Sequence, residues 1–90
     1  MSHDERVKQD LRREARVPVE GAVTLRFDRH RITCRLIDLS VSGFRAAHDC
    51  PALATGATVR FRHENGSGKA RVVWNRISGA SIQSGFFILD

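Results

Sequence analysis

Hydrophobic and polar residues alternate along most of the chain after residue 16, and this alternation predicts strands. The first alternating stretch runs from residue 17 to 27, and its apolar residues all fall at odd positions: Val17, Val19, Val23, Leu25 and Phe27. A period of two is typical of a β-strand with one buried face. Pro18 lies near the start, where a missing N–H is tolerated, and Gly21 in the middle predicts a bend or a bulge.

Further stretches with the same period follow, separated by short segments rich in turn-forming residues. The apolar positions predict strands over residues 32–36, 44–46, 59–61, 70–74 and about 80–89. The segments between them carry Asp, Ser, Asn, Pro and Gly, which favour turns and loops, with a strong hairpin signal at residues 64–68. No convincing helix follows residue 17. The pattern therefore predicts an all-β domain, either an antiparallel barrel or a sandwich.

The length and composition are those of one small globular domain. The chain has 90 residues, of which 41% are hydrophobic, and this share lies above that of a disordered chain. No stretch approaches the roughly 18 consecutive apolar residues of a membrane span, and the first nine residues lack the apolar core of a signal peptide. Two cysteines, Cys34 and Cys50, suit a reducing compartment. We therefore expect a cytoplasmic protein without a membrane span.

The first sixteen residues differ from the rest of the chain. Nine of them are charged, and because five bases nearly balance four acids, the segment is not a basic tail of the nucleic-acid-binding kind. Terminal segments of this composition are usually mobile. We expect residues 1–11 to form a flexible N-terminal arm and residues 12–90 to form the folded domain.

The net charge makes an anionic partner a reasonable hypothesis. Lys and Arg number 15 against 10 acidic residues, which gives a net charge of +5, and 13 of the 15 are arginines. The planar arginine fork binds phosphate through two hydrogen bonds and stacks on flat rings, whereas lysine is a point charge. Solubility and the codon bias of a GC-rich genome are the alternative explanation, and composition alone favours it.

Several familiar motifs fail on inspection of their context. The Gly66–Lys69 segment has part of the wording of a phosphate-binding loop, but a predicted strand follows it where a helix is required. Among the histidines and cysteines only His48 and Cys50 are close neighbours, so we expect solvated histidines and buried thiols rather than a zinc site. No nucleophile, acid–base pair or metal site stands out. We expect no catalytic residue, no metal, no cofactor and no enzymatic activity.

Two short motifs are specific in their order and spacing. The first is Arg12-x-x-x-Arg16, which is followed directly by the first predicted strand. The second is Asp38-x-Ser40-x-x-Gly43, which begins 22 residues after Arg16. Either motif alone is weak, because paired arginines are common in this chain and the second motif is most often a plain turn. Together, in this order and at this spacing, they are much more specific.

With these motifs the sequence resembles the PilZ domain family, whose signature is R-x-x-x-R followed, after about twenty to thirty residues, by D/N-x-S-x-x-G. Residues 70–74 look like the family's penultimate strand and residues 85–87 like its last strand. The resemblance extends over about residues 11–89. It implies a six-stranded antiparallel β-barrel, here without a substantial C-terminal helix. It also implies a stand-alone module that binds cyclic di-GMP, a bacterial second messenger.

The arginines of the first motif suit such a ligand, which has two phosphodiester charges and two guanines. Arg12 and Arg16 can each pair with a phosphate or stack on a guanine. On an extended segment four residues span about 13 Å, which is the scale of a cyclic dinucleotide. Arg13 lies between them and is a further candidate for binding phosphate.

The second motif suits the guanine base. Ionised Asp38 only accepts hydrogen bonds, so it can accept both neighbouring donors on the Watson–Crick edge of guanine. Ser40 adds a hydroxyl group, and Gly43 lets the backbone approach the ligand without a Cβ in the way. Trp74 offers a stacking surface, although core packing is the favoured role for this side chain.

Two other functions stay open at this point. One is a protein-interaction module of the same fold that does not bind nucleotide. The other is a basic barrel that binds single-stranded nucleic acid, which is disfavoured because aromatic residues are not interleaved with the basic ones. Since the chain has no output module, we expect cyclic di-GMP to act through an unidentified effector protein. Ordering of the N-terminal arm would present the altered surface.

Overall fold

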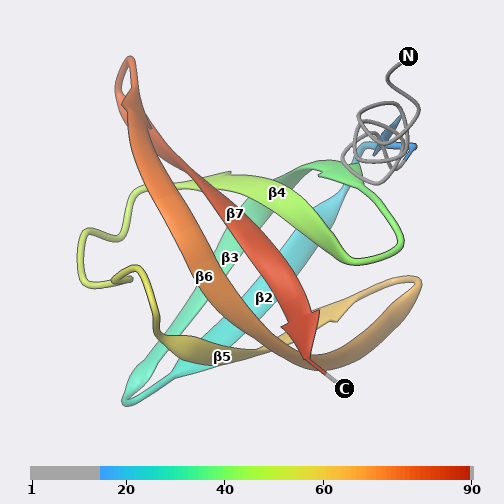
Figure 1. The fold of residues 1–90 in the computed structure, drawn as a ribbon. Helices are drawn as coiled ribbons and strands as arrows, with labels where there is room; N and C mark the ends of the chain where they lie inside the picture. The colour runs from blue at the N-terminus through green and yellow to red at the C-terminus, as the bar shows by residue number, and fades with distance from the viewer. Residues whose placement is uncertain (1–14, 90) are drawn as a thin grey trace, which may run out of the picture.

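The computed structural model describes residues 15–89, which form seven strands and no helix (Figure 1). The strands are β1 (Val17–Pro18), β2 (Ala22–Phe27), β3 (His30–Leu39), β4 (Gly43–His48), β5 (Thr58–His63), β6 (Gly66–Ser78) and β7 (Ser81–Leu89). Residues 1–14 and 90 lie outside the described part, and with them the arm that we expect at residues 1–11.

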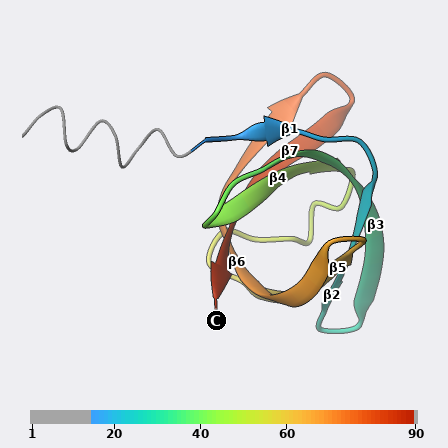
Figure 2. The same cartoon turned by 90° about the vertical axis from the view of Figure 1, so that its right-hand side faces the viewer.

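Six of the strands close into a barrel. Every neighbouring pair is antiparallel, in the order β3–β2–β5–β6–β7–β4, and β4 also pairs with β3, so the sheet has no free edge within these six strands. The two-residue β1 lies outside this ring and pairs with the end of β3 (Figure 2). The predicted six-stranded antiparallel barrel is confirmed, and the sandwich alternative is excluded.

The strand predicted over residues 17–27 is two strands. The chain bends at Gly21, whose φ of 132° favours glycine, and the bend separates β1 from β2. The bend was predicted, but Val17 does not share the buried face of Val23, since Val17 is 56% exposed. The reason is that β1 pairs with β3 beyond the closed ring and has no core beneath it.

The turns of the hairpins are shorter, and their strands are longer, than the alternation of residues predicts. The chain turns through two residues between β2 and β3, between β5 and β6, and between β6 and β7. The predicted hairpin at residues 64–68 is confirmed, but Gly66, Ser67 and Gly68 already belong to β6. The β6–β7 hairpin extends past the other strands in both views (Figures 1 and 2).

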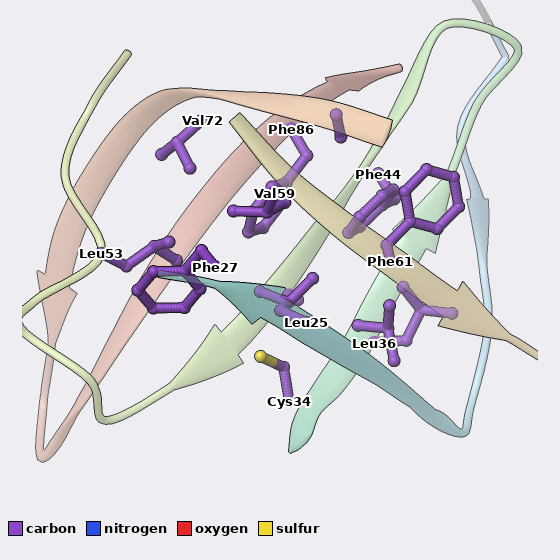
Figure 3. Packing of buried hydrophobic residues seen from close by; sticks show 13 residues of the cluster. Leu25, Phe27, Cys34, Leu36, Phe44, Leu53, Val59, Phe61, Val72 and Phe86 are labelled. Carbon is purple, nitrogen blue, oxygen red and sulfur yellow. The ribbon is translucent and has the colours of Figure 1, made fainter. Parts of the chain in front are cut away.

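The core fills the inside of the barrel with side chains from all six strands. Phe44 stacks on Phe86 at 4.6 Å between ring centroids and lies 5.1 Å from Phe61 in a tilted arrangement. Figure 3 shows these rings among aliphatic residues, with Leu53 of the 49–57 loop closing one end. Each such side chain contributes about 1.5–3 kcal/mol by leaving water. The alternation identified most of this core, including Val23, Leu25, Phe27, Cys34, Leu36, Val59, Ala70 and Val72.

A chain of polar side chains ties the 49–57 loop to the barrel wall. His48 Nδ1 accepts the backbone N–H of Cys50 at 3.0 Å, so His48 Nε2 carries the proton and donates to Ser84 Oγ at 2.7 Å. The Ser84 hydroxyl donates to Asn75 Oδ1, and Asn75 Nδ2 donates to the carbonyl of Leu53 at 2.9 Å. Burial lowers the pKa of His48 and keeps its ring neutral. The expectation of a solvated histidine is wrong here, because this network satisfies the buried ring.

Residues 15–89 contain no helix that could span a membrane. In the same part of the chain, no three His, Cys, Asp or Glu side chains cluster as a metal site would require.

Candidate ligand-binding site

Asp38 is at the centre of the candidate site, and a β-bulge places it there. Leu36 pairs with Ala46 and both face the core, so an unbroken period of two would also direct Asp38 inward. The register shifts between Leu36 and Asp38, however, and Asp38 pairs with Arg45, which faces outward. The bulge therefore turns the carboxylate to the outer face of the barrel.

Two arginines surround this carboxylate. Arg16 Nη1 donates to Asp38 Oδ1 at 3.1 Å, and this ion pair joins the two sequence motifs across 22 residues. Arg45 Nε donates to Oδ2 at 2.9 Å and to Oδ1 at 3.2 Å, and Arg45 Nη2 also donates to Oδ2. As a result the Asp38 side chain is only 4% exposed, whereas those of Arg16 and Arg45 are 43% and 36% exposed. Arg16 is held by one hydrogen bond and Arg45 by a fork.

The electrostatics keep Asp38 ionised. Burial on its own would raise the pKa of Asp38, but hydrogen bonds from Arg45 and the charges of Arg45 and Arg16 outweigh it, so the pKa lies below its ordinary value. The hydrogen bonds to Asp38 in turn raise the pKa of Arg45. The site thus holds one negative and two positive charges, which leaves it net positive toward solvent.

The turn that carries Ser40 and Gly43 lies directly after Asp38. The backbone N–H of Ser40 donates to the carbonyl of Gly43 at 2.8 Å, and the Ser40 hydroxyl donates to the same oxygen at 3.3 Å. The carbonyl of Ser42 accepts the N–H of Ile88 at 2.8 Å, which fastens the turn to β7. Val41 is 87% exposed. The turn therefore presents a fixed backbone beside the Asp38 carboxylate.

Gly43 has a packing reason to be glycine. A Cβ at this position would overlap the carbonyl oxygen of Phe86, because β4 runs very close to β7 here. Its backbone φ is not in the left-handed region. The requirement is thus one of space between two strands, and it stands beside the ligand-contact role expected from the sequence.

A row of four residues runs outward from Asp38 across β3, β4, β7 and β6. Asp38 pairs with Arg45, Arg45 with Gly85, and Gly85 with Trp74, so their side-chain positions are neighbours on the outer face; we call these four the site row. The indole of Trp74 lies over Gly85, where a Cβ would overlap it. The Arg76 guanidinium lies 5.5 Å from the centre of the Trp74 ring. Trp74 is half-buried against the outer wall rather than packed in the core.

The structure brings together four of the six residues predicted for the site. Arg16, Asp38, Ser40 and Gly43 are neighbours at one side of the barrel, whereas Arg12 and Arg13 lie outside the described residues. Sequence reasoning missed Arg45. The alternation of Phe44 and Ala46 could have placed it on the outer face, but its pairing with Asp38 depends on the bulge.

The comparison with protein families identifies the family of this chain. The family model of the PilZ domain matches residues 10–88. The chain belongs to the PilZ domain family. PilZ domains are cyclic di-GMP-binding modules and act as receptors rather than enzymes. No curated protein matches this PilZ chain.

Proposed function

We propose that this PilZ domain binds cyclic di-GMP through Arg12, Arg16, Asp38, Ser40 and Gly43, with Arg13 as a further phosphate ligand. The observation that carries the proposal is the Arg16–Asp38 ion pair. It joins the arginine motif to the second motif and leaves the remaining N–H donors of Arg16 on a guanidinium that is 43% exposed.

Binding proceeds by an exchange of partners at Asp38. Arg16 holds the carboxylate through one hydrogen bond, and it turns from Asp38 to a phosphate or a guanine of the ligand. Asp38 Oδ1, released by Arg16 and by the longer 3.2 Å hydrogen bond from Arg45 Nε, then accepts the guanine N1–H and N2 amino donors, while Arg45 stays on Oδ2 and keeps the carboxylate ionised. The buried, ionised carboxylate of Asp38 thus exchanges one set of hydrogen-bond donors for another, so its charge is not left without a partner.

The site row supplies flat surfaces for the bases. Arg45 and Trp74 are neighbours of Gly85 on the adjacent strands, and the missing side chain of Gly85 lets the Trp74 indole lie flat over the strand. A guanine that reaches Asp38 lies next to the Arg45 guanidinium, and the indole beyond it offers a second stacking partner. Trp74 is the single tryptophan of the chain, so its fluorescence reports ligand at this position.

The exchange also supplies a signal. When Arg16 leaves Asp38 for the ligand, the segment that carries Arg12, Arg13 and Arg16 is drawn over the ligand, and residues 1–11 are displayed differently to an effector protein. The protein acts in the bacterial cytoplasm as a receptor without catalytic activity or cofactor. Its two free cysteines fit a reducing compartment.

Isothermal titration calorimetry with cyclic di-GMP tests the proposal and gives the stoichiometry. We expect Arg12→Ala and Arg16→Ala each to weaken binding by about 1.5–3 kcal/mol, or about 10- to 150-fold. The effect of Arg16→Ala is the larger one, because Arg16 adjoins β1 and is already held at the site. Arg60→Ala, an exposed arginine on β5, is the matched control and should bind normally. Equal affinity of wild type and the Arg12→Ala/Arg16→Ala double variant would instead support a module that binds protein and not nucleotide.

The role of Asp38 in choosing the base needs a separate measurement. Asp38→Asn replaces one acceptor oxygen by a donor at nearly constant shape, so it should weaken cyclic di-GMP by about 1–3 kcal/mol and narrow the preference over cyclic di-AMP. Titration of both ligands into both proteins gives this ratio. An unchanged ratio would mean that Asp38 positions Arg16 and Arg45 and does not read the base.

A further inference from the structure

A second row of residues crosses the outer wall of the barrel away from the site row. Arg31 on β3 pairs with Arg26 on β2, Arg26 pairs with Arg60 on β5, and Arg60 pairs with Lys69 on β6; we call these four the basic row. All four are exposed. Directly opposite residues of antiparallel strands have Cβ atoms about 4.5–5.5 Å apart. The row is therefore an unbroken line of positive charge that crosses β3, β2, β5 and β6, four strands that can be followed in Figure 1.

No acidic side chain in the described part of the chain forms an ion pair with this row, although Asp28, next to the end of β2, lines a hollow together with all four of its residues. Within residues 15–89, the only ion pairs are those of Arg16 and Arg45 with Asp38. The adjacent row contains Thr33, Thr24, Arg62 and Ser67, which adds a further arginine and no acid. A hollow lined by Thr24, Arg26, Arg31, Arg60, Arg62 and Ser67 lies between the two rows. Like charges that face each other across strands destabilise a sheet, so the isolated barrel gains nothing from this arrangement.

The side chains around the basic row indicate which class of anionic partner it could bind. The exposed large apolar side chains of residues 15–89 are Val17, Val41, Val73, Ile77 and Phe87. None of them is on β2, β3 or β5, and the two on β6, Val73 and Ile77, lie four and eight residues beyond Lys69. The row therefore lacks the aromatic or apolar anchors of a protein interface and the apolar side chains that insert into a lipid surface. The exposed ring beside the row is that of His30, and it stacks on Phe27 at 4.9 Å between ring centroids, which covers one of its faces, whereas proteins that bind single strands stack successive bases on several aromatic side chains. A partner recognised by phosphate charge alone remains.

We propose that the basic row binds the phosphate backbone of a nucleic-acid duplex. Strands lie about 4.8 Å apart, so the three steps of the row cover about 14 Å. One strand of a duplex places one phosphate per about 3.4 Å of helix axis, so about four phosphates lie along that length, one for each basic side chain. Three of the four are arginines, which bind phosphate through two hydrogen bonds. Because the contacts are to backbone, binding is independent of base sequence.

Fluorescence anisotropy with a labelled 20-base-pair DNA duplex of mixed sequence tests this surface. Neutralising about four phosphates predicts a slope near −3.6 for the logarithm of affinity against the logarithm of salt concentration, which is about a 150-fold loss between about 50 and 200 mM salt. Arg26→Gln and Arg60→Gln should each make the slope shallower by about 0.9, whereas Arg60→Lys should keep it. Arg35→Gln, an exposed position on β3 four residues beyond Arg31, removes the same charge and should leave the slope unchanged.

Other outcomes of the same assay overturn the proposal. A salt slope that does not change in Arg26→Gln or Arg60→Gln would overturn it. An equal change of the slope in Arg35→Gln would also overturn it, because binding would then depend only on the net charge of the protein. Tighter binding to polyglutamate, or to phosphatidylcholine vesicles with about 30% phosphatidylglycerol, would assign the row to an acidic protein or to a membrane instead. Cyclic di-GMP binding by the Arg60→Gln variant is measured alongside and stays at the wild-type level, so this proposal and the proposed function fail separately.

Discussion

The two outer walls of the barrel use arginine in opposite ways. In the site row, Arg45 is fixed in a fork on Asp38, and Arg16 completes the shell around the same carboxylate. In the basic row, Arg26 and Arg60 face each other across two strands without an acidic partner in the described part of the chain. Both walls are built on paired antiparallel strands, so the difference comes from one acid, Asp38, and from the bulge that turns it outward.

The comparison of the two rows shows that positive charge and a fixed side-chain geometry are separate properties of a binding surface. Asp38 fixes the direction of the Arg45 guanidinium, and such preorganisation suits a small ligand whose groups must be matched one by one. The arginines of the basic row are not fixed by an ion pair within the described residues, which suits a partner with many equivalent charges. Under the two proposals, the same residue type serves selective recognition on one wall and electrostatic attraction on the other.

The largest expected effect is on the stability of the protein, and it is seen by comparing substitutions of two glycines, one from each wall. Gly43→Ala places a Cβ against the Phe86 carbonyl, which is backbone and cannot rotate away, so we expect a loss of about 3 kcal/mol in the free energy of unfolding. Gly68→Ala on β6 meets only the Phe61 ring at 3.4 Å and should change stability by less than about 1 kcal/mol. Urea denaturation of both variants measures this. Equal stabilities would contradict the close approach of β4 to β7.

The next effect concerns the acid that organises the site row. Asp38→Asn should destabilise the ligand-free protein by about 1–2 kcal/mol, because it replaces hydrogen bonds to a charged group while both arginines remain half-exposed and can return to water. Removing the charge of Arg60, which has no ion-pair partner among residues 15–89, should not destabilise the protein. Urea denaturation of Asp38→Asn and Arg60→Gln at neutral pH compares the two walls directly.

The pH dependence sharpens the same comparison. Since the pKa of folded Asp38 lies below its ordinary value of 3.8, its contribution to stability is complete above that value and is lost as the pH falls through the folded-state pKa. The stability difference between wild type and Asp38→Asn should therefore be constant near neutral pH and shrink in acid. Thermal unfolding in a series of buffers from about pH 7 to about pH 3 measures it. A difference that stays constant throughout would show that Asp38 does not act through its charge.

The smallest expected effect is an increase in stability. Arg26→Gln removes one of four neighbouring positive charges, so the melting temperature should rise by about 2 °C at low salt, and this gain should vanish at about 1 M salt. Arg35→Gln is the control and should change little. Calorimetry at both salt concentrations measures the shift. A fall in melting temperature would mean that the basic row has a structural partner after all.

Much of the barrel follows from local patterns. The alternation of Val23, Leu25 and Phe27, and of Cys34 and Leu36, predicted which faces are buried, because neighbouring side chains on a strand point to opposite sides wherever the strand is regular. The turn residues predicted where the chain reverses. The order of the two motifs pointed to the family. It also grouped Asp38, Ser40 and Gly43 in one turn, but Asp38 lies in β3 and Gly43 in β4, and only residues 40–42 connect the two strands.

What the alternation could not predict depends on which strands pair and in what register. The bulge after Leu36 turns Asp38 from the core face to the outer face, and a local period of two contains no signal for it. The partnership of Asp38 with Arg45, the position of Trp74 over Gly85 and the line from Arg31 to Lys69 all join residues from different strands. Such neighbours are decided by the closure of the barrel, because each strand contributes only one residue to a row and the register of every pair determines which one.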